Sequence, residues 1–228
     1  MPQQPSLMDR LKAETRKAHD ETEAIPFSAA MVAERLPVER FVGQLAAYRI
    51  VHAALESALA AATQPEVRSV WRNDLAKGPL LERDLAAFAR RGIAFDDAGI
   101  GPASEFAESI GRAAERDPLR LLGALYVLEG STLGAAVLRG HLASAYGLTA
   151  DEGLAYQSPY GASPMPHWRE FKARMNDAVV EPTAQERVIA GAIEAFERIG
   201  RILASLSDGL SGGAANGVTA GAARDAET

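Results

Sequence analysis

The chain has 228 residues, of which 47% are apolar and 6% aromatic, and it contains no cysteine. Its formal net charge of −6 argues against broad nucleic-acid binding, and the lack of cysteine excludes disulfides, thiolate metal ligands and iron–sulfur sites. The N-terminal residues lack the apolar core of a signal peptide, and no apolar run is expected to cross a bilayer, which predicts a cytoplasmic protein with no membrane attachment.

Helical periodicity covers nearly the whole chain, and no strand pattern interrupts it. Pro37 opens a long apolar segment, Asp117–Pro118 starts another, and Gly147 ends it. We expect helices at 7–24, 37–63, 67–77, 80–91, 104–115, 118–146, 166–180 and 182–206, short segments at 28–35 and 149–152, and loops at 92–102 and 157–166. The sequence therefore predicts an all-α, single-domain helical bundle over residues 1–206 and a disordered tail over residues 207–228.

The most unusual stretch is the apolar helix YVLEGSTLGAAVLRGHL at 126–142, because it contains three glycines. Each glycine inside a helix costs about 1 kcal/mol relative to alanine. Gly123, Gly130 and Gly134 lie seven and four residues apart, so we expect them to share one stripe of the helix. Such a stripe admits a flat partner close to the main chain, lets the helix bend, or lets two helices pack tightly.

The chain has four histidines, which are His19, His52, His141 and His167. No two of them are spaced as a metal-binding pair, and the Glu-x-x-His motifs of di-iron bundles are absent. A nucleophile elbow, a phosphate-binding loop and a dinucleotide fingerprint are also absent. We predict that His52 is a core residue, that His167 lies on the surface and that His141 lies near a helix end.

His19 belongs to a polar stripe in which Lys12, Arg16, His19 and Glu23 recur at helical spacing. One axial histidine is enough to hold a haem iron, and Glu23 could accept a hydrogen bond from its second ring nitrogen. Lys12 and Arg16 would lie roughly 5 to 10 Å from His19 along the helix axis, a distance that suits the anionic edge of a porphyrin. The alternative is a solvated helix face with ordinary i,i+4 ion pairs.

Three separated segments, LKAETRKAHDETE, YVLEGSTLGAAVL and FKARMNDAVVEP, resemble the biliverdin-producing haem oxygenases of bacteria. The resemblance implies a helical bundle that holds haem between a proximal and a distal helix, with His19 as the iron ligand. It also implies that Glu23 stands near the ligand, and that Lys12, Arg16 and Lys172 contact the haem propionates.

The resemblance further implies that Gly130 and Gly134 place bare main chain over the haem, with Ser131 among the catalytic residues and Tyr126 at the edge of the pocket. Many family members carry an aspartate at the position of Ser131, where it organises the water that helps to activate O₂. The serine leaves the proton-delivery group open. Ala135 replaces another common glycine.

The reaction implied by the resemblance opens the haem ring with O₂ and electrons to give biliverdin, CO and Fe²⁺, so that haem is both cofactor and substrate. Since no flavin or nicotinamide motif is visible, the electrons are expected from an external ferredoxin, flavodoxin or reductase. One alternative is a non-enzymatic haem-binding or haem-trafficking protein on the same scaffold. Another is a thiaminase-like helical enzyme without haem, which would need a carboxylate-rich internal pocket.

Overall fold

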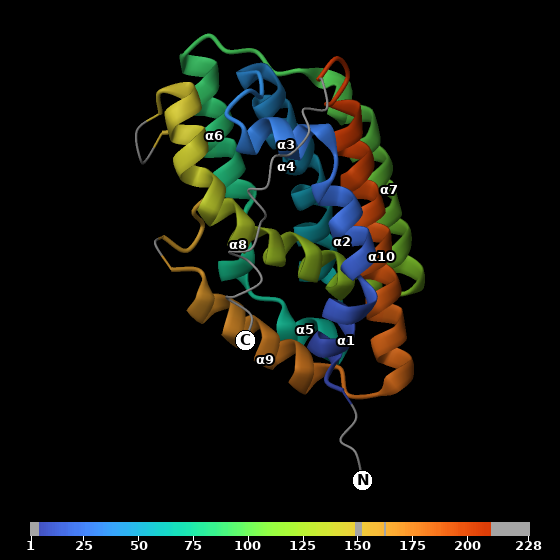
Figure 1. Cartoon of the computed structure of the whole chain (residues 1–228). Coiled ribbons are helices and arrows are strands. Elements are labelled where there is room, and N and C mark those ends of the chain that lie inside the picture. The colour runs from blue at the N-terminus through green and yellow to red at the C-terminus, as the bar shows by residue number, and fades with distance from the viewer. Residues whose placement is uncertain (1–4, 149–151, 162, 211–228) are drawn as a thin grey trace.

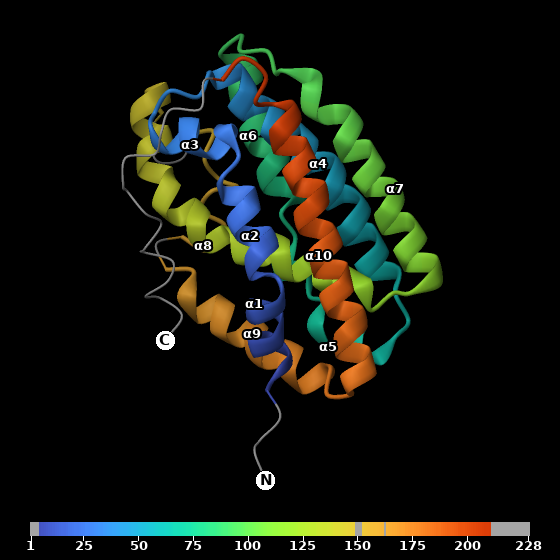
Figure 2. The same ribbon diagram turned by 45° about the vertical axis from the view of Figure 1, so that its right-hand side comes forward.

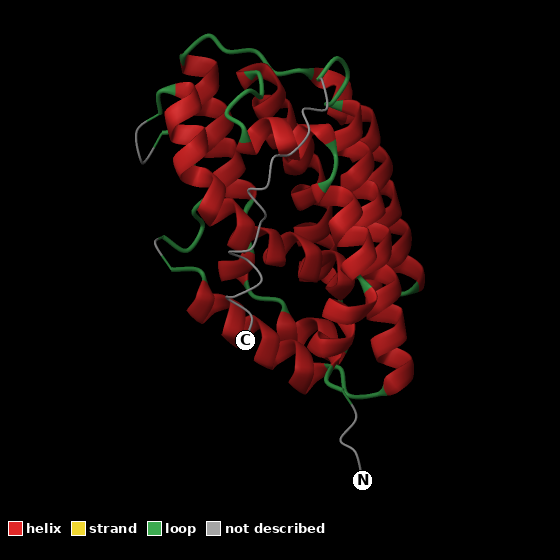
Figure 3. Cartoon of the chain, in the orientation of Figure 1, coloured by secondary structure: helices red, strands yellow, loops and turns green. Residues whose placement is uncertain are grey.

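The computed structural model describes residues 5–148, 152–161 and 163–210, and these residues contain helices and loops but no strand (Figure 3). The all-α prediction is confirmed. The elements are α1 (Leu7–Glu14), α2 (Arg16–Glu23), α3 (Pro26–Val32), α4 (Val38–Ala61), α5 (Pro65–Val70), η1 (Asn73–Leu75), α6 (Gly78–Arg90), η2 (Asp97–Gly99), α7 (Ile100–Arg116), α8 (Arg120–Tyr146), α9 (Met165–Ala178) and α10 (Pro182–Ser205).

Three long helices, α4, α8 and α10, organise the bundle (Figures 1 and 2). Helix α4 packs against α6 and α7, while α10 packs against α7, α8 and the short N-terminal helix α2. Large apolar side chains from several helices form one core, and Leu11, Phe41, Leu45 and Phe171 in it are fully buried. Burial of such side chains is the main favourable term in folding.

Helices α8 and α10 cross at a pair of glycines. A β-carbon at Gly123 would collide with the carbonyl oxygen of Val188, and one at Gly191 would collide with the carbonyl oxygen of Arg120. Only glycine lets the two main chains approach this closely. At Gly123, tight helix packing is therefore the correct explanation among those that the sequence left open.

Helix α8 crosses α10 with its N-terminal half and then changes direction (Figure 1). A bend in this helix agrees with its several glycines, because helices tend to kink at glycine and serine. By length and apolar composition this helix could cross a membrane, contrary to the sequence-based expectation. That is weak evidence, because half of its most apolar part is buried against other helices, as in a core helix.

The predicted helix over residues 7–24 is in fact two helices, separated at Thr15. The buried hydroxyl of Thr15 donates a hydrogen bond to the carbonyl oxygen of Leu11, 2.7 Å away, and this side-chain bond accompanies the break. Pro26 follows this segment and begins α3. The helix predicted over residues 67–77 is wrong beyond Val70, where an extended Trp71 caps α5.

The remaining boundaries are mostly close to the predictions. Gly147 adopts φ 59° and caps the C-terminus of α8, as expected. Helix α7 begins before Ser104, whose hydroxyl donates to the carbonyl oxygen of Ile100 instead of capping the helix. Residues 149–151 of the predicted short segment and residues 211–228 of the predicted tail lie outside the described residues.

Candidate haem-binding site

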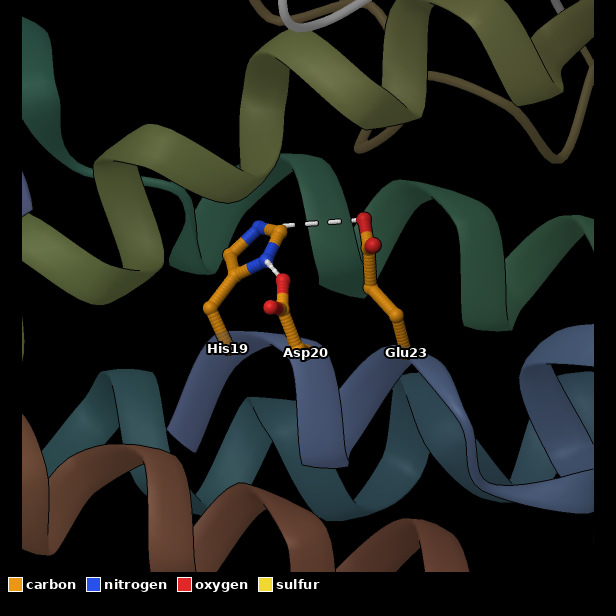
Figure 4. A group of neighbouring side chains, drawn as sticks. All are labelled: His19, Asp20 and Glu23. Carbon is orange, nitrogen blue, oxygen red and sulfur yellow. Dashed lines mark ion pairs between the residues drawn. The ribbon is translucent and has the colours of Figure 1, made fainter. Parts of the chain in front are cut away.

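The imidazole of His19 stands on α2 with 49% of its side chain exposed. Its Nε2 atom is 3.7 Å from a carboxylate oxygen of Glu23, and its Nδ1 atom is 3.7 Å from one of Asp20. Both distances exceed hydrogen-bonding range, so neither carboxylate holds a ring nitrogen directly. Figure 4 shows all three side chains on the side of α2 that faces the ribbon of α8.

Helix α10 supports both α2 and α8, because each of them packs against it. The ring of Phe196 on α10 meets the ring of His19 edge-on, with centroids 5.8 Å apart and planes at 74°. An edge-on aromatic contact of this kind favours one orientation of the imidazole. Helices α2 and α8 therefore both pack on α10, and Phe196 of α10 orients the ring of His19.

The glycines of α8 have different surroundings. A β-carbon at Gly134 would meet nothing within 4 Å, whereas one at Gly130 would lie 3.5 Å from Cη2 of Trp168. Ser131 between them is exposed, and its hydroxyl donates to the carbonyl oxygen of Leu128 at 2.7 Å. The expectation of one continuous bare stripe is wrong at Gly123, which is buried, but the main chain is open at Gly134.

Tyr126 belongs to an aromatic group beside the glycines. Its ring lies 5.9 Å from that of Trp168, which in turn stacks at 5.5 Å on Phe171. Trp168 and Phe171 are buried, as expected for packing residues, whereas Tyr126 is half-buried. Tyr126 therefore lies at the boundary between the core and the open part of α8.

The basic residues do not share one continuous helix face. Because the chain breaks at Thr15, Lys12 lies on α1 and Arg16 on α2. The Arg16 side chain is 75% exposed, and its Nε is 3.9 Å from a carboxylate oxygen of Asp20. Lys172 is half-buried on α9, on a separate part of the bundle. The three cations thus come from three helices.

The other histidines have partners. His52 is a buried core residue, as predicted, and bonds to Glu56. The ring of His167 is exposed, as predicted, and stacks on that of Tyr160 with centroids 4.2 Å apart. His141 lies 3.1 Å from a carboxylate oxygen of Glu34.

The sequence did not predict a buried ion pair between Lys77 and Glu129, which belongs to α8. The ammonium group of Lys77 is 2.9 Å from Glu129 and 2.8 Å from the hydroxyl of Tyr160, and it also donates to the carbonyl oxygen of Leu75. The Tyr160 hydroxyl donates to the second oxygen of Glu129, and burial raises the pKa of that hydroxyl. A lone glutamate in the apolar run before Gly130 was the available signal, since a buried charge needs a partner.

A second buried carboxylate, that of Asp84 on α6, holds the loop that contains Ala155 and Tyr156. Asp84 accepts hydrogen bonds from the backbone N–H groups of Ala155 and Tyr156, both at 2.8 Å. Burial raises the pKa of Asp84, although these two donors oppose the rise. Asp84 therefore positions the main chain that carries the Tyr156 side chain into the core.

The described residues fit a flat metal complex better than a bare cation. Ligand atoms of His19, Asp20 and Glu23 lie within 4.8 Å of one another, so a divalent ion is conceivable there, but all three side chains are exposed. A porphyrin needs an axial imidazole and a surface free of side chains. His19 offers the first, and Gly134 offers the second.

An exposed imidazole on α2 faces α8 (Figure 4), whose main chain is open at Gly134, and this arrangement fits the class of helical bundles that can hold a planar ligand. Comparison with protein families agrees with this class: the family model described as heme oxygenase matches residues 5–205. The chain belongs to the haem oxygenase family. No curated protein matches its sequence.

Solved structures share the fold. The chain is similar to heme oxygenase-1 from Synechocystis in complex with heme, with a TM-score of 0.80 and 19% identity over 90% of this chain and 94% of that one. It is also similar to the heme oxygenase of Leptospira interrogans, with a TM-score of 0.78 and 18% identity over 88% and 99% of the two chains. For the Neisseria meningitidis enzyme the TM-score is 0.65, with 22% identity over 88% and 92%.

Proposed function

We propose that this protein is a haem oxygenase that opens the ring of haem, with O₂ and reductant, to give biliverdin, CO and Fe²⁺. One observation carries the proposal within this family. The imidazole of His19 is exposed on the side of α2 that faces the ribbon of α8 (Figure 4), and on α8 a β-carbon at Gly134 would meet nothing within 4 Å.

On the proximal side, His19 would ligate the iron through one ring nitrogen. Glu23, one helical turn further on, can hold the other nitrogen through a water, which fixes the orientation of the ring. Lys12, Arg16 and Lys172 supply positive charge for the two propionates and so would select how the haem is seated.

On the distal side, Gly130 and Gly134 let the haem plane approach the main chain, and the exposed Ser131 hydroxyl can hold water near its face. Tyr126 would border the pocket beside Trp168. Bound haem, once reduced, supplies the O₂-activating chemistry, while the protein orients it, excludes bulk water and delivers protons.

The proposal includes an external electron donor, because the chain has no flavin or nicotinamide motif. A ferredoxin, a flavodoxin or a flavin reductase would provide the electrons. We place the protein in the cytoplasm, with no nucleic acid and no membrane among its partners. This is consistent with the net charge of −6 and with α8 serving as a core helix.

Turnover tests the proposal. The protein is loaded with haem and supplied with O₂ and a reductase, and the visible spectrum is followed together with CO release. We expect the haem band to decay, biliverdin absorption to appear, and His19→Ala to abolish the reaction while His167→Ala does not. A stable haem complex that yields no biliverdin would support the non-enzymatic haem-binding alternative instead.

A further inference from the structure

His19 has two carboxylates beside it, although a haem iron would take only the imidazole from this helix. One ligand atom each of His19, Asp20 and Glu23 lies within 4.8 Å of the other two (Figure 4). In the part of the chain that the structure describes, no other histidine or carboxylate belongs to a group of three with such spacing. The proposed haem ligand is therefore also a member of a set of ligands for a bare cation.

The sequence of α2 and one contact from α10 bring these ligands together. Asp20 directly follows His19, and Glu23 lies one helical turn after it, so both carboxylates reach the same ring. One oxygen of Asp20 is 3.7 Å from Nδ1 of His19, and one of Glu23 is 3.7 Å from Nε2. Phe196 of α10 meets the ring edge-on. The imidazole is thus held in place, and the carboxylates are the parts that can close around an ion.

The spacing of the three groups allows coordination after a small side-chain movement. Nitrogen and oxygen ligands lie about 2.0–2.2 Å from a metal such as zinc, so two of them can be at most about 4.4 Å apart. The observed limit of 4.8 Å is slightly wider than this. Because the side chains of Asp20 and Glu23 are 54% and 46% exposed, rotation about their own bonds can close the gap. Imidazole and carboxylate together are also a ligand set that binds Fe²⁺.

Asp20 connects this group with the outer surface of α2. One of its oxygens faces His19, and the other is 3.9 Å from Nε of Arg16, an exposed and therefore weak ion pair. Asp20 also borders a shallow surface hollow that His19 and Glu23 do not line. The other lining residues of this hollow are Ala13, Arg16, Lys17, Glu21 and Ala24. Asp20 is thus the ligand that both the imidazole and bulk water can reach.

We propose that His19, Asp20 and Glu23 form an acceptor site that takes up the Fe²⁺ set free by ring opening and passes it to solvent. The inference rests on the proposed haem oxygenase function and adds to it a place for the iron product. His19 stays bound to the ion, while oxygens of Glu23 and Asp20 replace the pyrrole nitrogens. Because the ligands are half-exposed, water screens and competes with them, and the resulting weak binding favours release of the ion over storage.

The transfer exchanges ligands and includes no redox step. The iron leaves the tetrapyrrole as Fe²⁺ and remains Fe²⁺ on the carboxylates, so no electron moves. The bonds from the pyrrole nitrogens to the iron break, and the two nitrogens that carried negative charge take up two protons from water. Bonds from the carboxylate oxygens to the ion form, and the two carboxylates neutralise its two positive charges.

The site can be tested in the whole chain without haem. Co²⁺ is the probe, because it stands next to Fe²⁺ among the divalent metals in its affinity for such ligands and absorbs visible light. We expect one Co²⁺ per chain. Mutation of residues that merely support metal ligands costs about 10- to 100-fold in affinity, so His19→Ala, Asp20→Asn and Glu23→Gln should each weaken binding at least about 10-fold. Anaerobic calorimetry with Fe²⁺ should rank the variants in the same order.

Two variants make matched changes outside the site. Glu21→Gln removes the same charge from α2 as Asp20→Asn, but Glu21 lies 3.7 Å from Lys17 and does not belong to the group of three. His141→Ala removes another partly exposed histidine, which pairs with Glu34. Both variants should bind Co²⁺ as the wild type does. A wild type without saturable binding, or an Asp20→Asn variant that binds as tightly as the wild type, overturns the site.

Turnover then tests the role of the site in iron release. Haem is supplied with O₂ and a reductase, CO release is followed, and a coloured chelator in solution captures free Fe²⁺. Since ring opening and iron loss break different bonds, the ratio of the two rates isolates the release step. We expect Asp20→Asn to lower the ratio of Fe²⁺ release to CO release by about 10-fold, in line with its lost affinity, and Glu21→Gln to leave the ratio unchanged. An unchanged ratio in Asp20→Asn overturns the role in release.

The two proposals fail in different ways. A wild type that binds haem but never degrades it contradicts the proposed function, even where Co²⁺ binds as predicted. A wild type that degrades haem, but whose apoprotein takes up neither Co²⁺ nor Fe²⁺ at His19, leaves the function standing and overturns the acceptor site.

Discussion

In its N-terminal half α8 is pressed against α10, and glycine at position 123 is required because any β-carbon would collide with the main chain of the partner helix. In its C-terminal half the same residue type at position 134 faces open space. The first glycine holds the bundle together, whereas the second keeps a surface clear. A glycine in a helix can therefore be required for packing, as at position 123, or leave an open surface, as at position 134.

The buried ion pair near the junction of the two halves gives the largest expected effect. Lys77→Met leaves Glu129 as an unpaired buried carboxylate, and breaking such a pair typically costs about 3–5 kcal/mol. Urea unfolding of the apoprotein measures this loss. The double variant Lys77→Met/Glu129→Leu should recover much of it, and a single variant as stable as the wild type contradicts the role assigned to the pair.

Gly123→Ala tests the packed half. The added methyl group has no space at the α8–α10 crossing, and overpacking of this kind typically costs about 1–3 kcal/mol. The gain in helix propensity, about 1 kcal/mol, offsets only part of it. Thermal unfolding of the apoprotein should show a lower Tm than the wild type. An unchanged or higher Tm would mean that the two helices separate easily.

The buried groups under α8 also predict a pH dependence. The pKa of His52 is lowered from its ordinary value of 6.5, chiefly by burial, so below that pH the unfolded chain binds a proton that the folded protein does not. Stability should therefore fall as the pH falls below 6.5, with a slope of at most about 1.4 kcal/mol per pH unit from this group. We expect His52→Gln to flatten the slope and the exposed His167→Gln to leave it unchanged.

Gly134→Ala tests the open half and should have the smallest effect on folding. Since its β-carbon meets nothing within 4 Å, the apoprotein should be as stable as the wild type or up to about 1 kcal/mol more stable. Haem affinity should fall instead, because the methyl group enters the surface proposed for the ligand. Loss of apoprotein stability with unchanged haem affinity would reverse the two roles.

The long helices were predictable because their signals are local. Prolines and the left-handed Gly147 bound α4, α8 and α10 within a few residues of the expected positions. The break at Thr15 was missed, because LKAETRKAH has helical spacing throughout and the hydroxyl bond to Leu11 appears only in the fold.

The candidate site was predictable only in part. His19 and Gly134 were predicted from spacing and resemblance; His19 lies on α2, on the side that faces the ribbon of α8 (Figure 4), and Gly134 lies on α8. The bond between His52 and Tyr156 joins residues 104 positions apart, and Lys77 and Glu129 are 52 apart. No periodicity encodes contacts between a loop and a helix at such separations, so these groups required the structure.

The most direct test of the central claim is a ferric haem titration followed by resonance Raman spectroscopy of the reduced complex. The account predicts one haem per chain and an iron–imidazole stretch that His19→Ala removes and free imidazole restores, while His141→Ala leaves it intact. A wild-type stretch that survives in His19→Ala, or a protein that binds no haem, would contradict it.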